Sequence, residues 1–493
     1  MLSRTLLVLA TILMGRLAAS TAPPERPVPG EARLEVVRLL HDGRFDEADE
    51  RLSVVGRFPA GPDRDFLRAF VLYWRLLYDP DNPALKIAFG SRLDAAVASA
   101  AARLAEAPAD AEALLGSGTA HLFLAELRAS EKRSFAAAME ARRARAELEE
   151  AAVANPDLAD PSFGLGTVDV LADALPSVAR GLSSVLGLGG NRERGLRRLE
   201  RAAAGGRTFA LEARLFLLSI HSSRRRREYD GALGAADLVA AFVPRSVASL
   251  DGAARVRLSL GAAGQAATDL DGALAAAAEA PRTDRSVLAT LLVERSRAEI
   301  ALFRPDRALD GLRRLVPLRA AIPPDLLKKA AEVVRVAASS GDLPGLAELE
   351  EVFGTGSAPP ALAGAGDSWA SWKKGIPALD LERGGEQDQA ADLLEALARD
   401  APGDAVLALL AGRAAVLAGR AARARLELAR AESSRLLPPA WLGPCLLFLG
   451  RAADLGGDRQ AAMGFYRRAA AAPSFVEREA AWLHLRVPYR APS

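Results

Sequence analysis

Small and large apolar residues recur at a helical period in the last repeat-like segment of the sequence. Ala462, Tyr466 and Ala469 are spaced i, i+4 and i+7, which puts their side chains on one face of a helix. A Gly-Asp turn signal precedes this row and Pro473 follows it, so the helix should begin and end between them. Gly450 lies twelve residues before Ala462, on the preceding apolar stretch. The pattern predicts two antiparallel helices that cross closely at Gly450 and Ala462, with Tyr466 filling the space beside the crossing.

The same order of small residues, a large residue and a proline recurs along the chain. Most spacings between equivalent positions fall between 34 and 51 residues, a period typical of helical solenoids. The pattern is weaker around Gly195, Ala273 and Leu346. The residues expected at successive crossings, on the second helix of each unit, are Ala48, Ala96, Ala144, Gly195, Ala232, Ala273, Ala308, Leu346, Ala390, Ala424 and Ala462.

In this order of residues the sequence resembles the tetratricopeptide repeat family, and the resemblance covers nearly the whole chain beyond its first residues. The early units are longer than the family's usual repeat, which is similar to a divergent long-repeat bacterial type. The resemblance implies an all-α fold, a right-handed helical-hairpin solenoid of about ten units with a long concave surface. The Gly-, Pro- and Ala-rich stretch 353–367 interrupts the rhythm and predicts a linker. We therefore expect one array over 31–352 and a second over 368–493.

The start of the chain predicts a secretory signal. Arg4 supplies a positive charge, residues 6–14 are apolar, and residues 18–20 have the small side chains typical of a cleavage site. The apolar run is too short for a comfortable membrane span. We expect a signal peptide over 1–20, a flexible Pro-rich segment over 21–30, and a secreted or periplasmic protein with no integral membrane span after cleavage. The alternative is an uncleaved N-terminal segment that anchors the protein to the membrane.

Composition narrows the classes of function. Lys and Arg together number 64 against 62 Asp and Glu, and the resulting net charge of +2 argues against a general nucleic-acid binder. Hydrophobic residues make up 50% of the chain but aromatic residues only 5%, which favours helices over strands. The single cysteine, Cys445, excludes an internal disulfide and a cysteine metal cluster, and its apolar surroundings predict a buried, inert thiol.

Catalytic and metal-binding signatures are missing from the sequence. The four histidines, His41, His121, His221 and His484, form no pair at metal-ligand spacing. No Gly-rich stretch matches a phosphate-binding loop, and no serine lies in a G-x-S-x-G motif. We therefore expect a protein that is not an enzyme, with no cofactor and no metal. Two close carboxylates with shifted pKa values in a cleft would instead indicate a hydrolase.

A row of arginines emerges when the repeat register is applied. In the tetratricopeptide family the first helix of each unit lines the concave groove, and the residue after its small residue contacts ligands. No unit here has asparagine at that position, which argues against the carboxylate clamp of chaperone-binding members. Arginine stands there instead, and its planar fork suits carboxylates and phosphates. The expected groove contacts are His221, Arg224, Arg225, Arg297, Arg335, Arg413 and Arg451. The alternative is that these side chains only solvate the groove.

These features predict a protein–protein interaction scaffold of the bacterial cell envelope, which binds a protein or peptide partner along a concave helical groove. An arginine-lined groove favours an acidic partner. The alternative is an accessory or assembly factor that docks an enzyme or exporter of an envelope polysaccharide or lipid pathway.

Overall fold

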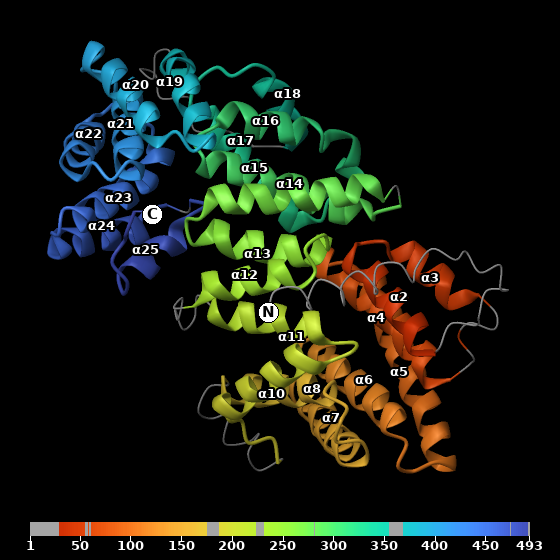
Figure 1. Ribbon diagram of the computed structural model, residues 1–493. Helices are drawn as coiled ribbons and strands as arrows, with labels where there is room; N and C mark the ends of the chain where they lie inside the picture. The colour runs from red at the N-terminus through yellow and green to blue at the C-terminus, as the bar shows by residue number, and fades with distance from the viewer. Residues whose placement is uncertain are drawn as a thin grey trace, which may run out of the picture.

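The chain folds as an all-α helical-hairpin solenoid, as the sequence predicts. A computed structural model describes residues 29–54, 58, 61–174, 187–222, 231–280, 282–353, 368–473 and 475–491. Within these ranges the regular structure consists of α-helices and one short 3₁₀ helix, without a strand (Figure 1). The helices follow one another as eleven hairpins, and a single further helix ends the described array.

Each hairpin has a first and a second helix. The first helices are α2 (Pro29–His41), α4 (Pro62–Tyr78), α6 (Ala111–Ser130), α8 (Pro161–Asp173), α11 (Ala210–His221), α13 (Val247–Ser259), α15 (Arg285–Ala301), α17 (Pro324–Ala338), α19 (Ser368–Arg383), α21 (Ala405–Leu417) and α23 (Pro439–Leu455). The second helices are α3 (Phe45–Ser53), α5 (Pro83–Glu106), α7 (Ser134–Ala154), α10 (Arg192–Gly205), α12 (Ala232–Phe242), α14 (Ala263–Glu279), α16 (Pro305–Arg313), α18 (Leu346–Phe353), α20 (Gln387–Asp400), α22 (Ala421–Ser433) and α24 (Arg459–Ala471). The 3₁₀ helix η2 (Val316–Ala321) follows α16, and α25 (Arg478–His484) follows the last hairpin.

Glycines allow the two helices of a hairpin to approach closely. A Cβ atom on Gly412 of α21 would lie 2.9 Å from Cδ2 of Leu428 of α22, and one on Gly166 of α8 would lie 2.8 Å from Cγ of Leu199 of α10. Such contacts are too short for any residue with a side chain, so these positions require glycine. All eleven residues expected at the crossings lie on second helices and are buried.

A count from the turn residue contradicts the expected register in α14, as it does in α12, where Ala236 and not Ala232 follows Gly231 by five residues. In α22, Ala424 follows the turn residue Gly419 by five residues, and Gly419 has a φ of 71°. The corresponding turn residue before α14 is Gly261, with a φ of 85°, so the equivalent of Ala424 is Ala266 and not Ala273. Ala273 lies seven residues further on the same buried helix face, because the helical pattern repeats after two turns.

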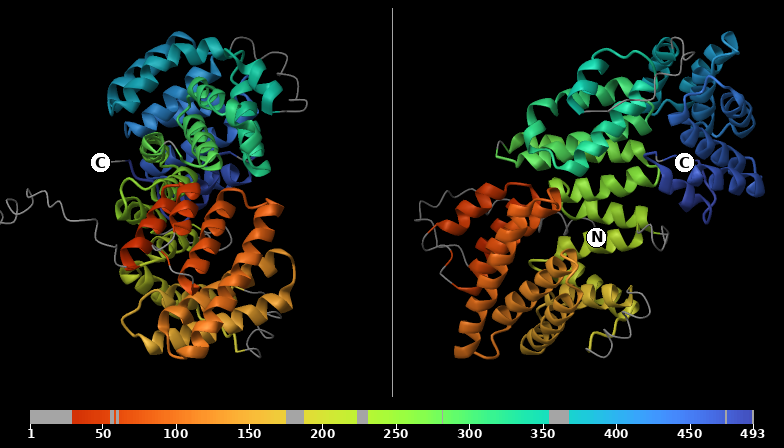
Figure 2. Two further views of the ribbon diagram at one scale, coloured as in Figure 1. Left: turned by 90° about the vertical axis from the view of Figure 1, so that its right-hand side faces the viewer. Right: turned by 180° about the vertical axis from the view of Figure 1, so that it is seen from behind.

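Both ends of the solenoid return to its middle. Figure 2 shows the N-terminal hairpins (red) and the C-terminal hairpins (blue) on opposite sides of the middle helices (green). Nε2 of His41 at the end of α2 lies 3.1 Å from Oε1 of Glu212 in α11, and the carbonyl of Gly43 accepts a hydrogen bond from the backbone N–H of Asp284. At the other end, α25 packs against α13. The curvature therefore places units that are distant in sequence face to face.

Some of the expected features fall outside the described residues. They are the signal peptide 1–20, most of the segment 21–30, nearly all of the linker 353–367, and Arg224 and Arg225. The division into two arrays thus stays a prediction. Of the helices that are described, none combines the length and apolar character that a membrane crossing requires.

Candidate functional site

A cavity of about 990 Å³ lies on the inner face of the solenoid, between its middle and C-terminal units. One wall comes from the starts of α12 and α14 and from the turn before α16, and the opposite wall comes from α19, α21 and α23. Residues 483–490, at the end of α25 and beyond it, cover one side. The volume lies at the upper end of the range for small-ligand sites, roughly 300–1,000 Å³. A neighbouring cavity of about 20 Å³ has room for little more than one water molecule.

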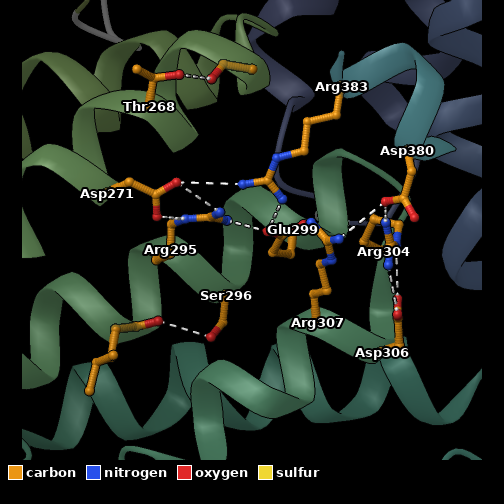
Figure 3. Close-up of polar contacts among 12 residues, drawn as sticks. Thr268, Asp271, Arg295, Ser296, Glu299, Arg304, Asp306, Arg307, Asp380 and Arg383 are labelled. Atoms are coloured by element: carbon orange, nitrogen blue, oxygen red, sulfur yellow. Dashed lines mark hydrogen bonds and ion pairs between the residues drawn. The ribbon is translucent and has the colours of Figure 1, made fainter.

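Ion pairs hold the two walls of this cavity together (Figure 3). Arg383 of α19 lies between Oε1 of Glu299 in α15, at 3.4 Å, and Oδ2 of Asp271 in α14, at 3.5 Å. Asp380, one turn earlier in α19, pairs with Arg304 at the start of α16. These contacts connect α14, α15 and α16 to α19 across residues that are far apart in the sequence.

Arg413 of α21 is one of two buried arginines from neighbouring first helices that line the cavity. It is 5% exposed and forms an ion pair with Glu382 at the end of α19. Its guanidinium carbon lies 4.8 Å from the ring centre of Phe303 and 5.8 Å from that of Phe448. Burial raises the pKa of Glu382, against the lowering effect of Arg413. Arg413 is thus electrically satisfied by Glu382 and fixed in place by aromatic faces.

Arg451 of α23 is the second buried arginine, and its surroundings differ. It is 4% exposed, and its guanidinium carbon lies 4.9 Å from the ring centre of Phe448 and 5.1 Å from that of Tyr489. Among the residues that the structure describes, Arg451 forms no ion pair, and its Nε has no hydrogen-bond partner. A buried charge without a carboxylate is uncommon in proteins, because desolvation costs several kcal/mol, of the order that a pair normally offsets.

Glu477 is the acid nearest to the two arginines in the C-terminal segment. It precedes α25, is 3% exposed and lines the cavity. Burial raises the pKa of Glu477, and the charges of Arg451 and Arg413 only partly oppose this shift. The side chain is therefore held closer to its neutral form than an exposed glutamate.

His484, at the end of α25, adds a neutral ring to the cavity wall. Burial and the charge of Arg451 lower the pKa of His484 to about 3, so the ring is uncharged at neutral pH. Its Nδ1 lies 3.4 Å from the carbonyl oxygen of Val487, which fits a proton on Nδ1. Nε2 then offers a buried acceptor, which has no partner within the described part of the chain.

The structure separates the groove residues that the sequence predicts. Arg413 and Arg451 lie together in the large cavity. Arg297 of α15 lines only the small cavity, Arg335 of α17 is exposed and lines neither, and His221 ends α11 outside both. The arginine row therefore does not form one continuous basic stripe.

The corrected register adds one residue to this row and explains why its members differ. Arg255 of α13 lies eleven residues before Ala266, as Arg413 lies before Ala424, and it pairs with Asp251 one turn earlier. Arg297 likewise pairs with Glu294 on its own helix. The two cavity arginines have apolar residues one turn earlier, so neither can pair with an acid at that position.

Sequence reasoning missed the residues that follow the last hairpin. Glu477, His484 and Tyr489 all lie beyond Pro473, in a segment too short for another hairpin. Such a segment is typical of a capping helix, which covers the exposed end of a solenoid. That signal could have identified α25 as a cap, but the capping pattern carries no information about the cavity it covers.

The lining of the cavity combines charged and apolar side chains. Nine charged side chains line it: Asp271, Glu299, Arg304, Glu382, Arg383, Arg413, Arg451, Glu477 and Arg490. Positive and negative charges are nearly balanced, and apolar side chains lie between them. In the described ranges, no three His, Cys, Asp or Glu residues are grouped in a way that could hold a metal ion.

Comparisons with known proteins add little beyond this geometry. No family model matches the chain, and no curated protein does. Among solved structures, the human IFIT1 dimer with PPP-AAAA is 15% identical, with 88% of this chain and 80% of that chain covered and a TM-score of 0.33. Naa15/Naa10 bound to HypK-THB is 14% identical, with 98% and 73% covered and a TM-score of 0.29. At such scores the comparisons carry no argument about ligand or activity.

Proposed function

We propose that this protein is a non-enzymatic interaction scaffold, a divergent tetratricopeptide-type solenoid that binds a protein or peptide partner on its inner face. The observation that carries the proposal is the cavity of about 990 Å³, framed by ion pairs between distant units and lined by two buried arginines. Solenoids of stacked hairpins use their inner surface for binding, because the surface is long, concave and rigid. A partner with acidic side chains would complement Arg451.

The proposed place of action is the bacterial cell envelope, with the protein secreted or periplasmic. The support is the sequence of the first twenty residues, with its charged start, short apolar run and small residues. Mass spectrometry of the native protein tests this part. A mature N-terminus near Ser20 in the periplasmic or secreted fraction is expected, whereas an intact Met1 in the cytosolic fraction would contradict it.

A matched pair of glycine variants tests the binding surface. Gly264 of α14 lines the cavity and Gly464 of α24 does not, and a Cβ atom on either glycine would meet nothing within 4 Å. Gly264→Tyr should therefore obstruct the cavity without disturbing the helix, and Gly464→Tyr should add the same side chain elsewhere. The full chain and both variants are used to capture proteins from envelope extracts, with quantification by mass spectrometry.

The expected result is a set of proteins captured by the wild type and by Gly464→Tyr but lost with Gly264→Tyr. The captured set should shrink as salt rises, since exposed charges are screened beyond about 10 Å at 0.1 M. Equal capture by all three proteins would place binding outside the cavity. Substrate turnover by the wild type that Gly264→Tyr abolishes would show an enzyme instead of a scaffold.

A further inference from the structure

Arg451 stands apart from the other buried arginines of the described chain. Three of the four form ion pairs there: Arg257 with Asp269, Arg304 with Asp380, and Arg413 with Glu382. Arg451 forms none, although it is 4% exposed. Arginine keeps its positive charge even when it is buried, so the charge remains without a partner. Aromatic faces attract the cation but accept no hydrogen bonds in the guanidinium plane, so its N–H groups remain available to a ligand.

The guanidinium is also fixed in orientation. Phe448 of its own helix and Tyr489 of the C-terminal segment hold it at 4.9 and 5.1 Å, and the backbone N–H of Tyr489 donates to Oδ2 of Asp454 at 2.8 Å. Nη2 reaches the turn before α14, where a Cβ atom on Gly261 would collide with it. Oε1 of Glu477 would lie 3.3 Å from the same point. A rigid fork held in this orientation is suited to one oxyanion, which accepts from its N–H groups.

The rest of the cavity offers an apolar surface beside Arg451. Asp271, Glu299 and Glu382 also line it, but each already pairs with an arginine. Leu260, Leu379, Leu417 and Leu483 form apolar parts of the wall. The apolar part of a small ligand would be stabilised by burial against these side chains. A small ligand also fits within a cavity of about 1,000 Å³.

We infer that this cavity binds a small organic anion, with one carboxylate or phosphate group on Arg451 and an apolar body against the leucines. The inference rests on the proposed function only in taking this cavity as the binding site. The ligand needs no protein partner. A bound anion would complete the pairing that Arg451 lacks and would connect α23, the turn at Gly261 and the C-terminal segment.

Calorimetric titration of the full chain with four probes tests the chemistry. The probes are hexanoate, hexyl phosphate, hexan-1-ol and inorganic phosphate. Hexanoate or hexyl phosphate should bind, and the tighter of the two identifies the oxyanion. Hexan-1-ol and inorganic phosphate should bind at least about tenfold more weakly, since each lacks one half of the recognised group. Absence of binding by both organic anions at millimolar concentration, or equal binding of hexan-1-ol, would overturn the inference.

Two arginine variants locate the site. Arg451→Met should lower the affinity for the organic anion roughly tenfold or more. Arg335→Met changes the exposed equivalent position of α17 and should leave this affinity as in the wild type. Unchanged binding by Arg451→Met, or equal loss in both variants, would overturn the assignment. Thermal melts without ligand give a second readout. Replacement of a buried unpaired charge by methionine should leave the melting temperature unchanged or raise it, and a large drop would show that Arg451 is already satisfied.

The two proposals fail in different ways. If Gly264→Tyr loses protein capture and the wild type binds no anion, the scaffold proposal is supported and the small-molecule site is refuted. If anion binding depends on Arg451 and no captured protein depends on the cavity, the small-molecule site is supported and the scaffold proposal is refuted.

Discussion

A Cβ atom on Gly450 would lie 2.6 Å from Cδ1 of Tyr466, so the aromatic ring occupies the space that the glycine leaves free. Tyr466 is fully buried, and its hydroxyl donates a hydrogen bond to Oδ2 of Asp454 at 2.8 Å. The pair couples the close approach of α23 and α24 to a polar contact at the end of α23. One small and one large residue thus fix the geometry of the last hairpin.

Gly450→Ala should destabilise the protein by about 1–3 kcal/mol, because the added methyl group overpacks the contact with Tyr466. Gly464→Ala is the matched control, since a Cβ atom there meets nothing within 4 Å and alanine favours the helix by about 0.5–1 kcal/mol. Urea unfolding of both variants measures the difference. Equal stabilities would show that α23 and α24 do not cross at Gly450.

Phe303 occupies a turn position that other hairpins fill with glycine. Its φ is 62°, close to the 71° of Gly419 and the 77° of Gly457 at the equivalent turns. A bulky residue in this region is strained, by about 1–2 kcal/mol. The ring is fully buried, and its centre lies 4.9 Å from that of Trp441. The guanidinium of Arg413 packs over its face. Packing therefore retains phenylalanine against the preference of the backbone.

Phe303→Ala should destabilise by about 3–5 kcal/mol, since a large buried ring is removed. Phe303→Gly should be about 1 kcal/mol more stable than Phe303→Ala, because glycine relieves the positive φ. At Phe448 in the interior of α23 the order should reverse, with alanine about 1 kcal/mol better than glycine. Chemical denaturation of the four variants tests both orders, and the same order at the two positions would refute the strain at Phe303.

The sequence was sufficient for the fold because hairpin packing is local. The sequence spacings from Gly450 to Ala462 and Tyr466 recur in other hairpins. Each helix crossing depends only on residues of one hairpin. The register failed at Ala273 because α14 is rich in alanine, so that several faces fit the pattern equally well. The turn residue Gly261 would have settled the register as Ala266.

The candidate site could be predicted only in part. Local register placed Arg413 and Arg451 on neighbouring first helices, and the structure brings them into one cavity. Their difference depends on contacts with other units: Glu382 reaches Arg413 from the preceding unit, while Tyr489 covers Arg451 from the segment after the last hairpin. The repeat pattern does not determine the curvature of the solenoid, so these partners could not be predicted from the sequence.

The Cys445 thiol should be inert in the folded protein. It is fully buried, and burial raises the pKa of Cys445, so the reactive thiolate is scarce. A thiol-specific disulfide reagent should give no signal with the native protein and one equivalent per chain in denaturing urea. Rapid labelling of the native protein would place α23 at the surface and contradict the packing described.

Glu294 should make the stability of the protein depend on pH. Burial by itself would raise the pKa of Glu294, but its pairs with Arg297 and Lys329 outweigh burial and lower it to about 2. With an ordinary value of 4.5 in the unfolded chain, the stabilisation is fully present above about pH 4.5 and is lost as the pH falls towards 2. Its size is on the order of 3 kcal/mol, since one pKa unit corresponds to about 1.4 kcal/mol.

Glu294→Gln should therefore be less stable than the wild type at pH 7 by up to about 3 kcal/mol, and the gap should narrow between pH 4.5 and pH 2 because both side chains are then uncharged. Glu348→Gln, on the exposed face of α18, is the control and should unfold like the wild type at pH 7. Urea unfolding at pH 7, 4.5 and 3 measures the gap. If the gap stayed constant over this range, Glu294 would not be the charged partner of Arg297 and Lys329, and the pairing that neutralises this part of the arginine row would be wrong.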